Sequence, residues 1–321
     1  MAPLPADHHG LITHASAAAT GRVAQLEAAH RGGRLMRIRN GVYRHAAAGE
    51  PDSAPARDRQ RYELLVRAAA HRQRAPVFTS YSAAILMGLP IIGRWPSTIY
   101  RLRPGPTGRR RGDVIDVASR KPIEPVAHEG ALLTPIEFTL IQLARHAPLV
   151  CALAAWDAAL LVPRAPGAEP ITTPDQMAAE HHRLLPYHGS RRVEAVLSRA
   201  STASESALET LSGLTIEELG FPAPERQAHL WLPDLQTDAY VDFFWREFGI
   251  AGEADGYAKY VGGGEDAATR VLEEKRREDA IRRQVHGFAR WTWADAWHRR
   301  GLEVALRSAG VPQTRARRLL R

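Results

Sequence analysis

Apolar and polar positions near the N-terminus predict two short helices followed by a β-hairpin. Residues 14–19 and 22–30 have helical spacing and are separated and ended by glycines. Residues 34–45 then place β-prone apolar side chains on both sides of Asn40-Gly41, a dipeptide that favours a type I′ turn. This order is typical of a winged helix, in which one element enters a DNA groove and the hairpin contacts the backbone.

After this hairpin the pattern changes to alternating helical and strand-like segments. Residues 47–60 are rich in Ala, Pro and Asp and predict a linker. The segments beyond it predict a mixed α/β region with a basic loop at residues 105–112. The expected helices are 61–72, 134–147 and 149–161, and the expected strands include 97–104 and 113–119.

The last third of the chain predicts a sheet flanked by helices. Ser206 and Glu209 form a capping-box pattern, which begins a helix that ends at Gly220. Three strand-like segments follow, then a long charged helix, a fourth strand and a last helix that begins at Asp295. The predicted fold class is α/β, or α+β overall. The expected domains are a winged helix at 1–50, a mixed α/β middle domain at 51–200 and a mixed-sheet domain at 201–321.

Composition indicates a folded protein and argues against a membrane-spanning, secreted or disulfide-linked one. Apolar residues make up 45% of the chain and charged residues 24%. No apolar run reaches the ~18 residues of a membrane span, and the first residues lack the pattern of a secretory signal. The single cysteine, Cys151, excludes an internal disulfide, and its apolar neighbours favour a buried thiol. We therefore expect a cytoplasmic protein without membrane contact and assign no zinc site.

The positive charge is concentrated in the first third of the chain. Residues 1–120 hold nineteen arginines against eight acidic residues, whereas the whole chain has a net charge of +8. An arginine-rich composition explains the preference for Arg over Lys, but phosphate binding explains the asymmetry more directly. The alternative is a small structural subdomain with solvated arginines. The candidate DNA contacts are Arg31, Arg34, Arg37, Arg39 and Arg44.

Five segments of the first half, taken in order, carry a resemblance to a known family. They are GLITHASA, RLMRIRNGVYRH, TSYSAAILMGLP, LLTPIEFTLIQLAR and AAWDAAL. Over roughly residues 10–165 the chain resembles the AbiEi-type antitoxin and transcriptional-regulator family. The resemblance implies a DNA-binding repressor that is often paired with a nucleotidyltransferase toxin. Gln142 departs from the pattern, because an acidic residue is expected there.

Three acidic residues on the predicted strands form the candidate chemical site. Asp242 lies among apolar neighbours, and Glu253 and Asp255 point to one face of the following strand because side chains alternate. Carboxylates that converge are costly unless a cation or proton offsets their charge. A hard divalent ion with oxygen ligands, Mg²⁺ or Mn²⁺, would offset it and activate water toward a phosphodiester.

The same region carries a second resemblance. The stretches SALE, GFPAPERQ, YVDFFW, EADGYAKY, EKRREDAIRR and RWTWADAW, in this order, resemble the PD-(D/E)XK restriction-endonuclease-like superfamily, closest to its Vsr-like branch. The resemblance implies that Asp242 and Glu253 are metal ligands and that Glu209 is the acid of the first helix.

One position departs from that superfamily. The lysine expected two residues after the glutamate is Asp255 here. The chain has only three lysines, and Lys259 or Lys275 could supply the missing ammonium from another backbone position. In the alternative interpretation Asp255 begins a turn and Lys275 pairs with acidic residues on a helix surface. The spacing of Trp291, Trp293 and Trp297 favours core packing over base stacking.

These observations leave three functions open. The first is a DNA-binding regulator or antitoxin whose C-terminal domain does not cut. The second is a metal-dependent DNA endonuclease in repair or defence, delivered by the winged helix. The third is an interaction module that neutralises a cognate toxin protein by contact. A homodimer fits a winged-helix regulator, although no heptad repeat requires one.

Overall fold

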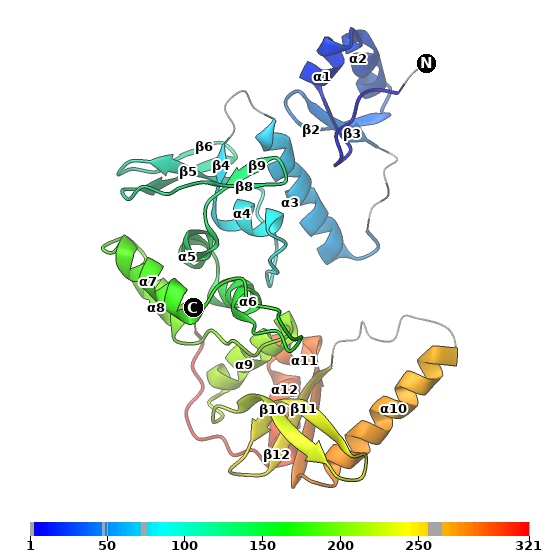
Figure 1. Ribbon diagram of the computed structural model, residues 1–321, viewed down its shortest axis with the longest axis vertical. Helices are drawn as coiled ribbons and strands as arrows, with labels where there is room; N and C mark the ends of the chain where they lie inside the picture. The colour runs from blue at the N-terminus through cyan, green and yellow to red at the C-terminus, as the bar shows by residue number, and fades with distance from the viewer. Residues whose placement is uncertain (1–2, 47–48, 50, 72–75, 256–264, 321) are drawn as a thin grey trace. The chain divides into compact units, whose positions relative to one another are not determined.

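The computed structural model describes residues 3–46, 49, 51–71, 76–255 and 265–320, and it confirms the α/β class (Figure 1). The chain forms two compact units. The first contains residues 1–89, 93–146 and 180–186, and the second contains residues 90–92, 147–179 and 187–321. In the described part, no helix is long and apolar enough to cross a bilayer.

The first unit begins with the predicted two helices and hairpin. Thr13 caps the first helix by accepting a hydrogen bond from the Ser16 amide, and Gly41 at the hairpin turn has a φ of 75°. A short strand that we did not predict precedes the helices and completes an antiparallel sheet of order β1-β3-β2. The elements are β1 (Leu11–Thr13), α1 (His14–Ala19), α2 (Val23–Arg31), β2 (Leu35–Arg39) and β3 (Val42–His45).

Helix α3 (Ala54–Ala70) begins earlier than the sequence suggested. The predicted linker to residue 60 is therefore too long. The Ser53 side chain caps the helix by accepting from the Ala56 amide, and Pro55 is tolerated in the first turn, where no intrahelical donor is needed. The buried Ala68 of this helix forms an apolar cluster with Leu11 and Val42 of the winged helix.

A six-stranded mixed sheet of order β6-β7-β5-β4-β9-β8 completes the first unit. The basic loop predicted at 105–112 is partly wrong, because Arg109–Arg111 pair with β7 as an edge strand. Arg101 and Arg109 both form ion pairs with the buried Asp116, which holds this edge in place. The strands are β4 (Val77–Phe78), β5 (Ile99–Pro104), β6 (Arg109–Arg111), β7 (Val114–Ser119), β8 (Val126–His128) and β9 (Ala131–Leu133), with helices α4 (Ser80–Leu86) and α5 (Ile136–His146).

The second unit contains helices from before residue 200 together with the C-terminal sheet. Asp157 of α6 accepts hydrogen bonds from Thr210 Oγ1 of α9 at 2.7 Å and from the Ser201 amide at 2.8 Å, which ties these segments together. Cys151 is buried as expected. The helices are α6 (Leu149–Leu160), α8 (Ser190–Leu197) and α9 (Ala207–Leu219), and α7 (Pro174–Leu184) has residues up to 179 in the second unit and the rest in the first.

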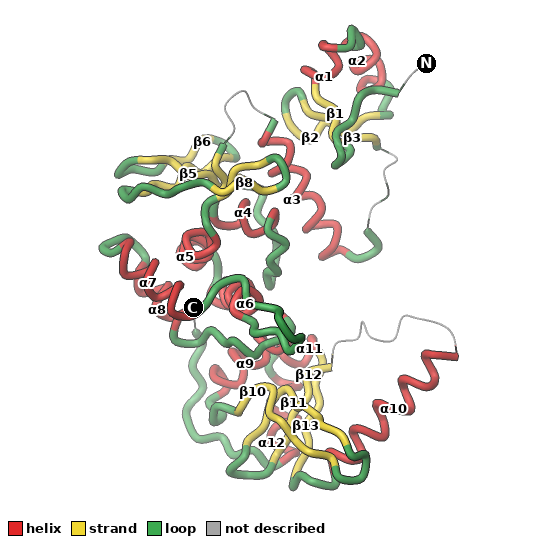
Figure 2. The backbone as a smooth tube through the Cα atoms, in the orientation of Figure 1, coloured by secondary structure: helices red, strands yellow, loops and turns green. Residues whose placement is uncertain are grey.

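The C-terminal sheet has the predicted order of elements, with strands β10-β11-β12-β13 and only the last pair parallel (Figure 2). Phe243 packs with α9, α11 and α12 on one side of it, and Phe244 belongs to a separate cluster that includes Ile281 of α10. The elements are β10 (Glu225–Leu232), β11 (Thr237–Trp245), β12 (Ile250–Asp255), α10 (Glu265–Arg282), β13 (Gly287–Thr292), α11 (Trp293–His298) and α12 (Arg300–Ala309).

The prediction that three tryptophans pack in the core is right for one of them. Trp291 is buried at 1% exposure, and its indole donates to Ser212 Oγ. Trp293 and Trp297 are 42% and 43% exposed. The strand ends at Thr292, so the two later tryptophans lie on a helix whose inward position belongs to Ala296.

Candidate functional site

The structure gathers Glu209, Asp242 and Glu253 around the end of the C-terminal sheet. Glu209 lies in the first turn of α9, where Ser206 caps the helix and its hydroxyl donates to the Glu209 carboxylate at 2.8 Å. Antiparallel pairing of Phe243 with Gly252 places Asp242 of β11 beside Glu253 of β12. Glu209 and Glu253 are both buried. Asp242 and Glu253, which the strand pattern indicated, thus lie together with Glu209, which the second resemblance added.

Gln227 of β10 links two of these carboxylates. Its side-chain amide donates to Glu209 Oε2 at 2.8 Å and to Asp242 Oδ1 at 3.0 Å. Its own carbonyl oxygen accepts from Arg164 at 2.6 Å. The residue has a φ of 50°, in the left-handed region that is strained for a glutamine. Sequence reasoning placed Gln227 on a strand but did not assign it to the site, because no spacing rule marks a glutamine that bonds across strands.

Asp242 carries the largest electrostatic penalty of the cluster. Burial and the neighbouring Glu209 carboxylate raise the pKa of Asp242 to about 6, and Glu253 adds to the effect. Hydrogen bonds from the Ala254 amide, at 2.8 Å to Oδ2, and from Gln227 act in the opposite direction. A carboxylate in this state is a candidate proton acceptor near neutral pH or a ligand for a cation.

Glu253 is neutralised by two arginines. Arg277 of α10 approaches Oε1 at 3.3 Å, and Arg290 of β13 approaches Oε2 at 3.4 Å. Parallel pairing puts Arg290 directly beside Glu253. Burial raises the pKa of Glu253, and the two guanidinium groups partly oppose that rise. Arg290 also lies 3.7 Å from Asp255, so Glu253 and Asp255 share a face as predicted.

Lys275 does not occupy the place that the sequence suggested for it. Lys275 is exposed on α10 and forms no ion pair with a described residue. Lys259 lies outside the described residues. Among the described residues, the cations beside Glu253 are Arg277 and Arg290. The sequence predicted the fourth strand but not its neighbour in the sheet, so it did not point to Arg290.

The oxygen-rich cluster partly fits a divalent cation. Asp242 and Glu253 offer the carboxylate ligands that Mg²⁺ and Mn²⁺ prefer. Within the described ranges, however, no group of three His, Cys, Asp or Glu residues is placed to hold a metal ion. A cation at Glu253 would have to displace the ion pairs to Arg277 and Arg290.

The winged-helix arginines divide into two sets. Arg31, Arg34 and Arg37 are exposed and form no ion pair with any residue in the described part of the chain. Arg39 forms an ion pair with Asp113 at 3.1 Å and is 16% exposed, and Arg44 donates to the Gly49 carbonyl at 3.5 Å. Three of the five predicted DNA contacts are thus presented to solvent, whereas the other two bind their own chain.

Comparison with known proteins adds no assignment, because no family model and no curated protein matches this chain. The two resemblances drawn from the residues therefore remain predictions.

Proposed function

We propose that the protein is a DNA-binding regulator or antitoxin of the AbiEi type, which reads DNA through its N-terminal winged helix. The observation that carries this proposal is the outward presentation of Arg31, Arg34 and Arg37, while Leu35 and Val42 of the same hairpin are buried. Buried apolar side chains fix the hairpin, and unpaired guanidinium groups are free to bind phosphates and base edges. A cytoplasmic location, homodimerisation and a cognate toxin partner belong to the same proposal.

Fluorescence anisotropy with duplexes from the DNA upstream of the protein's own gene tests this proposal. We expect Arg34→Gln/Arg37→Gln to weaken binding about tenfold or more, because two phosphate contacts are removed. Arg59→Gln is the control, since Arg59 is exposed on α3 outside the winged helix. Equal affinities for the double variant and the wild type would refute the proposal.

A second candidate function is a metal-dependent endonuclease, favoured by the partly buried Asp242 and its raised pKa. Asp242 and Glu253 would hold Mg²⁺ or Mn²⁺, and the ion would supply a hydroxide nucleophile near neutral pH. Arg277 or Arg290, released from Glu253, would stabilise negative charge on the phosphate in place of the missing lysine.

Cleavage of supercoiled plasmid with and without Mg²⁺ or Mn²⁺ tests the nuclease candidate. Asp242→Ala and Glu253→Ala should both abolish metal-dependent cutting, whereas Asp279→Ala, an exposed carboxylate of α10, should leave it unchanged. If the wild type binds duplex DNA but does not cut it with either metal, the nuclease candidate is wrong and the C-terminal unit has a structural role. Co-purification with the product of a neighbouring gene tests a toxin partner.

A further inference from the structure

Two exposed indoles lie on α11, the helix that directly follows the strand paired with β12. Trp293 and Trp297 are four residues apart on α11, so they share one face of that helix. The parallel pairing of Asp255 with Thr292 puts Trp293 one residue past the same sheet edge as the acidic residues. Solvent-exposed tryptophans at helical spacing are costly in water and form a stacking surface for flat ligands.

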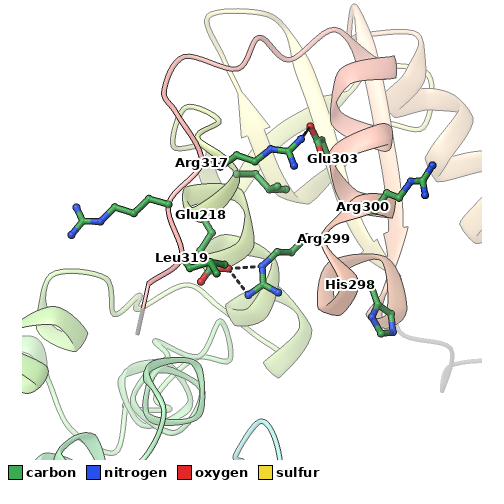
Figure 3. A pocket seen from close by; sticks show the side chains of 9 residues that line it. Glu218, His298, Arg299, Arg300, Glu303, Arg317 and Leu319 are labelled. Atoms are coloured by element: carbon green, nitrogen blue, oxygen red, sulfur yellow. Dashed lines mark hydrogen bonds and ion pairs between the residues drawn. The ribbon is translucent and has the colours of Figure 1, made fainter.

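A basic cavity of about 540 Å³ lies at the C-terminal end of the same helix, where His298 is one of its lining residues (Figure 3). His298 directly follows Trp297 and lines the cavity together with Arg300 and Arg318. The two acidic residues of the lining are already paired: Glu218 with Arg299 at 2.7 Å, and Glu303 with Arg307 at 3.1 Å and with Arg317.

The charge left over in this cavity is positive. Arg300 and Arg318 are exposed, and among the described residues neither guanidinium group has an acidic partner. A polyanion would complement them without displacing an existing ion pair.

We infer that the second unit binds single-stranded nucleic acid along this path, with bases stacked on Trp293 and Trp297 and phosphates in the cavity at Arg300 and Arg318. Interleaved aromatic and basic side chains are the usual means of binding single strands without sequence preference. The inference goes beyond duplex binding by the winged helix and does not depend on it.

Anisotropy of a fluorescein-labelled oligothymidylate with the full-length protein tests the inference. We expect Trp293→Ala/Trp297→Ala to weaken binding about tenfold or more, since base stacking on an aromatic ring contributes substantially at each site. Arg300→Gln/Arg318→Gln should weaken binding as well and reduce its salt dependence. Trp231→Ala is the matched control, because Trp231 is 47% exposed on β10 away from the cavity, and Arg276→Gln on α10 is the control for charge.

Three outcomes show whether single strands bind at Trp293 and Trp297 or elsewhere on the protein. Single-strand binding that survives Arg34→Gln/Arg37→Gln but is lost in the tryptophan variant supports the inference, whether or not duplex binding by the winged helix exists. Unchanged oligothymidylate affinity in the tryptophan variant overturns it. An equal loss with Trp231→Ala also overturns it. Melting temperatures close to that of the wild type will show that the exposed positions can be changed without unfolding.

Discussion

At the scale of single residues, the pKa values of Asp242 and Glu253 depend on the hydrogen-bond donors and charges that surround each carboxyl group. Asp242 receives one amide from Gln227 and one from the backbone at Ala254, while Glu209 and Glu253 oppose its ionisation. Glu253 is compensated instead by Arg277 and Arg290. The free-energy cost of ionising a carboxyl group in this cluster is thus largest at Asp242.

Asp242→Asn should therefore stabilise the protein relative to the wild type as the pH rises. A carboxyl whose pKa is raised in the folded state, here from 3.8 to about 6, contributes stability below pH 4 that is lost as the pH rises through 6. Asparagine does not ionise, so the difference between the two proteins should shift toward the variant by up to about 3 kcal/mol between pH 4 and 7. Urea unfolding followed by tryptophan fluorescence measures it.

The exposed Asp279→Asn serves as the control and should show no such trend. A lost hydrogen bond lowers the stability of Asp242→Asn by the same amount at every pH, so the trend with pH is the diagnostic quantity. A constant difference across the range would contradict the proposed environment of Asp242.

At the scale of elements, helix ends and close backbone approaches position the site. Helix α9 begins at the Ser206 cap beside the carboxylates and ends at Gly220, whose φ is 77°. The Gly220 carbonyl then accepts the backbone amides of Thr314 and Arg315, each at 3.0 Å, so the C-terminal segment is fixed against the end of α9. The same C-terminal segment continues to Arg318, which lines the basic cavity.

Gly220→Ala should be markedly destabilising. A Cβ there would lie 2.2 Å from the Arg315 carbonyl oxygen, and the left-handed backbone disfavours an L side chain. We expect a loss of about 2–3 kcal/mol in urea unfolding. Gly167→Ala is a matched control with a φ of 78° and open space around the Cβ, and it should cost only about 1 kcal/mol. Equal losses would show that the contact with Arg315 does not matter.

At the scale of the whole molecule, charge is distributed unequally between the regions that we assign to duplex and single-strand binding. The first 120 residues carry a net charge of +11, whereas the chain as a whole carries +8. The sequence from residue 121 onward is therefore slightly acidic overall, and its basic cavity is a local feature. Duplex binding should consequently respond to salt mainly through the first unit.

The salt dependence of duplex binding gives a quantitative check. Removing the three exposed arginines, as Arg31→Gln/Arg34→Gln/Arg37→Gln, should reduce the slope of log affinity against log salt by up to about 2.7, at ~0.9 per lost phosphate contact. Titrations between roughly 50 and 200 mM salt measure this slope. Arg39→Gln should change it little, because Arg39 is paired with Asp113. An unchanged slope in the triple variant would exclude phosphate contacts by these residues.

The sequence predicted those parts that depend on local chemistry. Asn40-Gly41 marked the hairpin, Ser206 marked the start of α9, and alternation put Glu253 and Asp255 on one face. Each of these features follows from a few neighbouring residues. Gln227, Arg277 and Arg290 were missed as site residues, because their contacts with the carboxylates span 15 to 37 positions along the chain.

Taken alone, the sequence determined the order of elements in the N-terminal hairpin region and the C-terminal sheet, the asymmetry of charge and the candidacy of Asp242 and Glu253, since hydrophobic periodicity and composition are local properties. Only the tertiary structure decided which cations neutralise those acids, which arginines are free to bind a ligand, and that Trp293 and Trp297 face solvent. These properties depend on strand register and on which element covers a given face. Both are fixed by packing between residues far apart in the chain.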